Sequence, residues 1–309
     1  MDKVKLNPLQ GFVLGLMRLL GRLPKGFHFA MADFIAWFAR RVLHYREQVV
    51  TVNLARSFPE LKYWELEPLA KEFYRHFADL FTEVVRYSVF QGEKGRKRLR
   101  DSHILEVNDV SLVNRLLETT PSVMVLNSHL GNWELFGGIS ECGYDPKEPF
   151  ALRPGHIVAV YKEMTSKFSD GLFEACRLGP VLGTDFDGYV ESSQVMRFAL
   201  KNRDRKRFYM FNTDQSPYGN AAWTEVTFLN QPTRAMLGGA SLACRLHYSV
   251  VYLHWARPER GRYEARFIPI CEDASTMTPE GIMQAFYRLL EANIREDPAM
   301  YLWTHKRWK

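Results

Sequence analysis

The spacing of apolar residues along the chain predicts alternating helices and buried strands. From Glu65 to Phe90 apolar side chains return every three or four positions, which is the period of an amphipathic helix. Val123 to Leu126 is a continuous apolar run, typical of a strand that is buried on both faces. Similar runs predict strands at 157–161, 208–211, 249–255 and 263–270, and helical patterns lie near 169–178, 192–201 and 233–246. A last helix is expected from Pro279, with Thr278 as its cap. This order predicts an α/β fold with a mixed central sheet flanked by helices.

The first 44 residues carry two apolar runs, at 9–20 and 27–38, divided by Pro24. The longest stretch without charge is 12 residues, from Leu6 to Met17, and a membrane-spanning helix needs about 20 apolar residues. We therefore expect two short helices in the bilayer interface, with nearby arginines meeting lipid phosphates: Arg18, Arg22, Arg40 and Arg41. The alternatives are a helical hairpin packed on the protein core and a tilted span by residues 6–23.

Charge and cysteine content narrow the classes of partner. The chain has 41 Lys and Arg against 35 Asp and Glu, a net charge of +6, which suits a phosphorylated lipid, an acidic carrier protein or a membrane surface. We expect no nucleic-acid partner, because no zinc finger, RNA-binding aromatic motif or helix-turn-helix pattern is present. The basic run 94–100 is interpreted as a solvated loop or a lipid-facing patch. The four cysteines form no CxxC and are expected to be reduced, buried thiols.

The segment after the strand at 123–126 carries the candidate chemistry. It reads NSHLGNWE and ends at Glu134, five residues after His129. On one continuous helix these two side chains would be about 500° of rotation apart and would point away from each other. Gly131 and Asn132 supply a turn between them, and Asn132 is a good cap for a helix that begins at Trp133. The sequence therefore predicts that the turn brings His129 and Glu134 face to face.

A histidine with a carboxylate on its second nitrogen can act as a general base. The imidazole takes a proton from a hydroxyl at neutral pH, and the carboxylate fixes the tautomer. These are two members of a catalytic triad whose nucleophile is supplied by the substrate. The alternative is a capped loop with a structural histidine. A metal site is disfavoured, because no second His or Cys lies at ligand spacing near His129, and we expect no metal or cofactor.

Several ordered motifs extend this pattern. They are Tyr45 and Arg46, NLARSFPE at 53–60, SHLGNWE at 128–134, VYK at 160–162, Arg177, TDQ at 213–215, Phe228 and YLWTHKRW at 301–308. Together they resemble the late-step acyltransferases of lipid A biosynthesis, over nearly all of residues 45–309. The resemblance implies an enzyme of the bacterial inner membrane, on its cytoplasmic face. It implies transfer of a fatty acyl chain from acyl carrier protein to a hydroxyl of a lipid A precursor.

The resemblance also assigns roles and boundaries. His129 is the expected general base and Glu134 its orienting partner. The expected substrate-binding residues are Asn132, Lys162, Arg177, Asp214 and Gln215. Arg307 is either a head-group contact or a surface charge. Residues 1–44 are expected to form an N-terminal membrane-associating helical segment, and residues 45–309 the acyltransferase domain.

Two departures from the family pattern leave the acceptor open. Lys162 stands where the family often has arginine, so the charge is kept but the bidentate fork is lost. The loop 216–223 differs from that of the commonest members. The alternative acceptors are another membrane lipid, such as a glycerophospholipid, a phosphoinositol mannoside or an aminolipid, or water, which would make the protein a thioesterase. A non-catalytic membrane scaffold is the alternative of another class.

Overall fold

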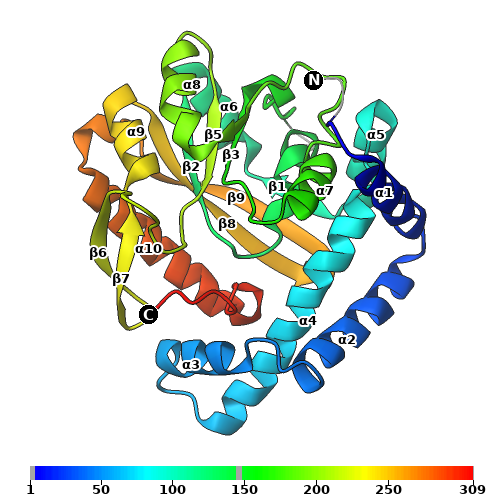
Figure 1. Ribbon diagram of the computed structural model, residues 1–309. Coiled ribbons are helices and arrows are strands. Elements are labelled where there is room, and N and C mark those ends of the chain that lie inside the picture. The colour runs from blue at the N-terminus through cyan, green and yellow to red at the C-terminus, as the bar shows by residue number, and fades with distance from the viewer. Residues whose placement is uncertain (1–3, 144–147, 309) are drawn as a thin grey trace.

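A seven-stranded sheet forms the centre of the computed structural model, which describes residues 4–143 and 148–308 (Figure 1). In this part of the chain the strand order is β1-β9-β8-β2-β5-β3-β4, and neighbouring strands are parallel except the antiparallel pair β8 and β9. The predicted α/β fold with a mixed central sheet is confirmed. The strands are β1 (Leu105–Asn108), β2 (Val123–Asn127), β3 (Ile157–Tyr161), β4 (Tyr189–Glu191), β5 (Phe208–Asn212), β8 (Ser249–Glu259) and β9 (Arg262–Cys271).

Helices flank the sheet and also extend away from it. β2 is buried along its whole length, and α9 and α10 pack on β8 beside it. The antiparallel hairpin of β6 (Trp223–Phe228) and β7 (Gln231–Met236) lies outside the main sheet. The α-helices after the N-terminal pair are α3 (Glu47–Ser57), α4 (Tyr63–Tyr87), α5 (Gly92–Ser102), α6 (Val110–Thr119), α7 (Lys167–Arg177), α8 (Val195–Lys201), α9 (Gly238–Leu246) and α10 (Pro279–Glu296). The 3₁₀ helices are η1 (Trp133–Glu141), η2 (Pro154–His156), η3 (Ser192–Gln194), η4 (Ala274–Thr276) and η5 (Pro298–Met300).

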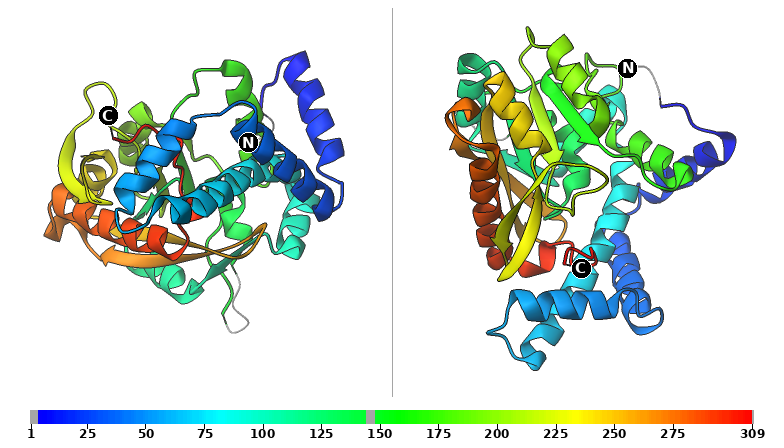
Figure 2. Two further views of the ribbon diagram at one scale, coloured as in Figure 1. Left: turned by 90° about the horizontal axis from the view of Figure 1, so that it is seen from below. Right: turned by 60° about the vertical axis from the view of Figure 1, so that its left-hand side comes forward.

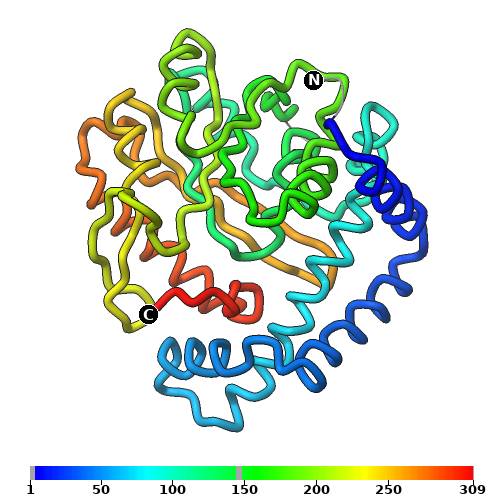
Figure 3. Tube along the Cα trace, viewed as in Figure 1, coloured from blue at the N-terminus to red at the C-terminus, as the bar shows by residue number. Residues whose placement is uncertain are grey.

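The N-terminal region forms two short helices, α1 (Pro8–Leu20) and α2 (Lys25–Arg41), as predicted. Asn7 caps α1 through a reciprocal pair of hydrogen bonds with Gln10. The tube in Figure 3 follows the chain from α1 through α2 and α3 into the long helix α4, on which all three pack. Over residues 4–143 and 148–308, no helix is long and apolar enough to cross a membrane. The boundary at residue 44 stays a prediction.

Two local predictions were wrong, and one helix was not predicted. The basic run 94–100 lies in helix α5 and not in a loop, and the alternative of a lipid-facing patch stays a prediction. The predicted helix 233–246 begins as strand β7, in which Thr233 and Ala235 are buried while Pro232 and Arg234 are exposed. This alternation has the period of a strand, and the helix starts only at Gly238. Helix α3 was not predicted, and Figure 2 shows it with the first turns of α4, projecting from the body of the sheet.

Candidate functional site

The ends of two neighbouring parallel strands bring His129 and Asp214 together. β2 and β5 lie side by side in the sheet (Figure 1) and pair in a register that sets Asn127 level with Asn212. Each site residue follows its strand by two positions. The Asp214 carboxylate accepts hydrogen bonds from His129 Nδ1 at 2.7 Å and from the His129 backbone N–H at 3.1 Å. Asp214 is only 2% exposed, so its position relative to the imidazole is well determined by packing.

The surroundings of Asp214 keep its carboxylate ionised. Burial by itself raises the pKa of Asp214, but the charge of His129, two hydrogen bonds from His129 and the charge of Arg307 bring that pKa below its ordinary value. An ionised acceptor at Nδ1 selects the tautomer in which Nδ1 carries the proton. The His129 Nε2 lone pair is then free to accept, and the Gln215 side-chain amide donates to it at 3.2 Å.

Aromatic and basic neighbours complete the environment of the imidazole. The edge of the Trp133 indole meets the His129 ring, with 4.9 Å between ring centroids. Burial, followed by smaller effects of Arg307, His129 and Arg46 against an opposing effect of Asp214, lowers the pKa of His305 to about 4. His305 is therefore neutral at pH 7 and places no competing positive charge beside His129.

The turn that was predicted between His129 and Glu134 is present. Gly131 has φ of +68°, and a Cβ there would lie 3.0 Å from the Trp255 ring. A left-handed conformation with a close neighbour suits glycine. Asn132 then caps η1, because its side-chain oxygen accepts from the backbone N–H of Glu134 at 3.1 Å. The prediction that Asn132 is a helix cap is confirmed.

Glu134 does not face His129, which corrects the predicted pairing. Its two carboxylate oxygens accept from Arg177, from Nε at 2.5 Å and from Nη2 at 2.7 Å. Burial lowers the pKa of Arg177, but the charge and hydrogen bonds of Glu134 outweigh burial and raise that pKa above its ordinary value. The turn separates the two side chains so that each meets a partner distant in sequence. In the sequence, Asp214 follows a predicted strand. This position suggested that Asp214 lines a site, but it indicated no particular partner.

The other predicted residues divide into those at the sheet edge and those inside the protein. Lys162 follows β3, the neighbour of β5, and is exposed. Its ammonium lies over the Tyr218 ring, 3.2 Å from the centroid. Arg307 is buried and donates to the Tyr287 hydroxyl and the Arg234 backbone oxygen. Its guanidinium therefore holds the C-terminal segment in place and is not a surface charge.

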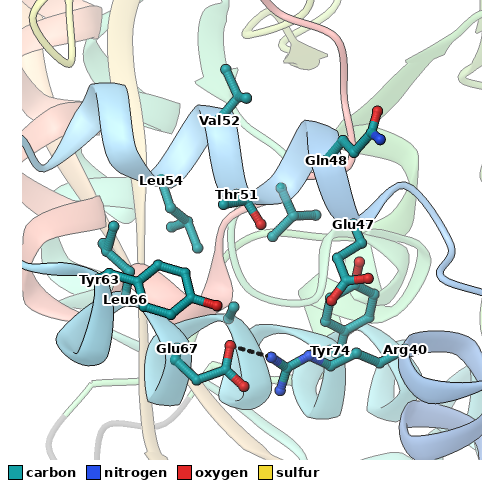
Figure 4. A pocket seen from close by; sticks show the side chains of 12 residues that line it. Arg40, Glu47, Gln48, Thr51, Val52, Leu54, Tyr63, Leu66, Glu67 and Tyr74 are labelled. Atoms are coloured by element: carbon teal, nitrogen blue, oxygen red, sulfur yellow. Dashed lines mark ion pairs between the residues drawn. The ribbon is translucent and has the colours of Figure 1, made fainter.

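Two cavities in the described residues lie around helix α3. One, of about 390 Å³, lies between α3 and α4, and Figure 4 shows the Arg40 to Glu67 ion pair at its wall. The other, of about 500 Å³, is lined by residues 44 and 46–49, at the start of α3, and by Lys306. Neither is lined by His129 or Asp214. The catalytic candidates therefore stand at the edge of the sheet rather than in either cavity.

Comparison with known proteins identifies one family. The family model described as bacterial lipid A biosynthesis acyltransferase matches residues 6–144 and 190–309. The matched ranges include His129, Glu134 and Asp214, and the gap between them contains Lys162 and Arg177. No curated protein matches the chain.

Proposed function

Because the chain belongs to the family of bacterial lipid A biosynthesis acyltransferases, we propose that it transfers a fatty acyl chain from acyl carrier protein to a hydroxyl of a lipid A precursor. The observation that carries the proposal is the hydrogen bond between His129 Nδ1 and the buried Asp214 carboxylate. That contact leaves Nε2 as the basic atom at the carboxyl edge of the sheet, where open α/β sheets commonly bind their ligands.

The proposed reaction uses His129 twice. The acceptor hydroxyl takes the place of the Gln215 amide at Nε2 and gives its proton to that nitrogen. The oxygen forms a bond to the thioester carbonyl carbon, and the tetrahedral intermediate then breaks its carbon–sulfur bond. The departing sulfur receives the proton from Nε2, which yields an ester and a free thiol. Asp214 holds the ring and stabilises the imidazolium between these two steps.

Arg177 and Lys162 are proposed to bind the charged parts of the substrates. Glu134 holds Arg177 through two hydrogen bonds, which fixes the plane of the guanidinium beside the turn that carries His129. Lys162 extends from the neighbouring strand at the same edge of the sheet. We assign Arg177 to a phosphate or oxyanion contact and Lys162 to a phosphate contact. Glu134 then acts on the site through Arg177, not through His129.

We also propose that α1 and α2 lie on the cytoplasmic face of the inner membrane. The buried face of α1 contains the polar Gln10, which donates to backbone oxygens of Lys167 and Phe168, while a stripe of large apolar side chains is exposed. On both helices this stripe has helical spacing: Leu9, Phe12, Leu16 and Leu19, then Phe27, Phe34, Trp37 and Phe38. Exposed apolar area of this kind favours lipid contact.

The arginines near these helices differ in what they can contribute. Arg40 is buried and pairs with Glu67, and Arg18 donates to Gln91, so both meet protein partners. Arg22 is exposed and continues the proposed lipid-facing surface. Of the four arginines that were expected to meet lipid phosphates, Arg18 and Arg40 therefore contact protein groups, and Arg22 stays a candidate for a lipid contact.

Product analysis tests the function directly. Purified protein is incubated with a panel of acyl-acyl carrier proteins and lipid A precursors, and the lipids are analysed by mass spectrometry. We expect one added acyl chain with the wild type, and a loss of about 10²–10⁴ in rate with His129→Ala. His156→Ala is the control, because His156 lies on η2 and its ring accepts from the Arg153 backbone N–H. Release of free fatty acid without a lipid product would indicate a thioesterase. Absence of turnover of any thioester would indicate a non-catalytic scaffold.

A further inference from the structure

A buried carboxylate on helix α4 contacts the turn that separates His129 from Glu134. Glu83 is 2% exposed. Its Oε2 accepts from the Asn132 side-chain amide at 2.6 Å and from the Tyr263 hydroxyl at 2.9 Å. Its Oε1 is buried without a hydrogen-bond partner among the described residues. Burial of an ionised carboxylate in this position costs desolvation free energy. The proposed acyl transfer assigns no step to Glu83.

The contact with Asn132 determines which way that amide points. Because an ionised carboxylate only accepts, the NH₂ group of Asn132 must face Glu83. The Asn132 oxygen is then directed to the backbone N–H of Glu134, which it caps. Reversal of the amide would put an oxygen against the carboxylate and leave the Glu134 N–H without its cap. The charge on Glu83 thus selects one orientation of the residue at the centre of the turn.

A second contact from the next turn of α4 supports the same segment. The Tyr87 hydroxyl donates to the backbone oxygen of Leu135 at 3.1 Å. Helix α4 therefore holds the 131–135 segment at two points, one of which depends on charge. The contact through Tyr87 is neutral and stays the same when Glu83 gains a proton.

We propose that Glu83 is a positioning residue of the acyl-transfer site, whose ionised carboxylate holds the Asn132 amide so that the turn directs His129 to Asp214 and Glu134 to Arg177. The proposal rests on the proposed function of the His129 and Asp214 pair. Glu83 touches neither substrate nor the reacting atoms and acts through Asn132.

The groups that face Glu83 set its pKa near neutral pH. They are Asp79 and Arg86 on α4, Tyr263 on β9 and Asn132 on the turn. Burial and then the charge of Asp79 raise the pKa of Glu83 to about 7, against the opposing hydrogen bonds of Tyr263 and Asn132 and the charge of Arg86. The ionised, positioning form therefore predominates above about pH 7, and the neutral form below it.

The neutral isostere Glu83→Gln tests this with two measurements. The first is kcat/KM between pH 5.5 and 9, with acyl-acyl carrier protein and a lipid A precursor. We expect the variant to lose about 10²-fold at pH 8, the scale of a small misplacement of catalytic groups. The ratio to wild type should approach one below pH 6, where wild-type Glu83 is also neutral. Glu72→Gln is the matched control, because Glu72 is a half-exposed acid of the same helix that pairs with Arg75 and Arg257.

The second measurement does not need the acceptor. In ¹⁵N-labelled protein, the side-chain amide signals of Asn132, assigned with Asn132→Ser, should move with a midpoint near pH 7 in wild type. They should not move over that range in Glu83→Gln, and His129→Ala should leave the midpoint unchanged. Asp79→Asn should shift the midpoint to lower pH, because the charge of Asp79 raises the pKa of Glu83.

The outcomes separate the two proposals. Absence of acyl transfer by the wild type, with the Asn132 signals behaving as described, would overturn the proposed function and leave the role of Glu83 in the turn intact. Wild-type kinetics for Glu83→Gln at every pH would overturn the role of Glu83. So would an equal loss at every pH with a lowered melting temperature, since that pattern indicates a purely structural residue.

Discussion

Replacement of Asp214 by asparagine is the most direct test of how His129 is oriented. The change keeps the size of the side chain and removes its charge. In the structure the carboxylate accepts both from Nδ1 and from the backbone N–H of His129. An asparagine at 214 can present its NH₂ group to Nδ1, and the imidazole proton then moves to Nε2. A histidine in that tautomer cannot accept the proton of an acceptor hydroxyl at Nε2.

The magnitude follows from the contacts that are lost. A hydrogen bond to a charged group is worth about 1.5–3 kcal/mol, which corresponds to roughly 10- to 150-fold in rate. Loss of the productive tautomer removes the whole general-base contribution of about 10²–10⁴, and the hydrogen bond is part of that contribution because it acts only through His129. We expect kcat of Asp214→Asn to fall by about 10²–10⁴ with little change in KM, because the loss is confined to the transition state.

The assay is a steady-state measurement of kcat for Asp214→Asn and for Glu134→Gln, which shows which of the two carboxylates orients His129. In the second variant Arg177 loses a charged partner while the His129 to Asp214 contact remains. A value of kcat within about threefold of wild type for Asp214→Asn would refute the reasoning, and a collapse only in Glu134→Gln would restore Glu134 as the orienting group.

Thermal unfolding across pH supplies the control for folding of Asp214→Asn. The folded-state pKa of Asp214 lies below its ordinary value. The ionised carboxylate therefore stabilises the fold above about pH 4, and this contribution is lost as pH falls through the folded pKa. We expect the variant to melt below wild type at pH 7, with a difference that shrinks toward pH 3.

Three further changes have expected outcomes. Arg177→Lys removes the bidentate pair of hydrogen bonds to Glu134. We expect kcat/KM to fall by roughly 10-fold or more, because a charge-assisted hydrogen bond is worth about 1.5–3 kcal/mol. Unchanged kinetics would exclude a role for the bidentate geometry. Phe12→Asp places a charge on the exposed stripe of α1, where Phe12 is 71% exposed, and should weaken flotation with phosphatidylglycerol vesicles at least about 10-fold, whereas the control Val52→Asp on α3 should not. Gly131→Ala places a Cβ on a residue with left-handed backbone conformation, against the Trp255 ring. We expect the free energy of unfolding, measured with denaturant, to fall by about 1–3 kcal/mol. An unchanged free energy of unfolding would contradict the expected strain.

The local elements were largely predictable from the sequence. The 3.6-residue period located α4, and continuous apolar runs located β2, β3 and β5 within a residue of their ends. Thr278 and Pro279 begin α10 as expected. The signals in these segments are dense and lie within the element itself. Strand β7 was missed because it is short and runs almost directly into α9, so a single helical pattern covered both.

The partners of the site residues were decided by tertiary structure. From the sequence, His129 and Glu134 looked like one pair because they are near each other in the chain. The fold instead joins His129 to Asp214 and Glu134 to Arg177, 85 and 43 positions away. The physical reason for the pairing of His129 with Asp214 is sheet order. The apolar pattern of β2 marks it as a buried strand, but only the packed sheet makes β5 its neighbour and sets Asn127 level with Asn212. The sequence by itself thus determined which residues follow the predicted strands and that a turn separates His129 from Glu134. The pairing of β2 with β5 brought Asp214 to His129, and the packing of α7 on η1 brought Arg177 to Glu134.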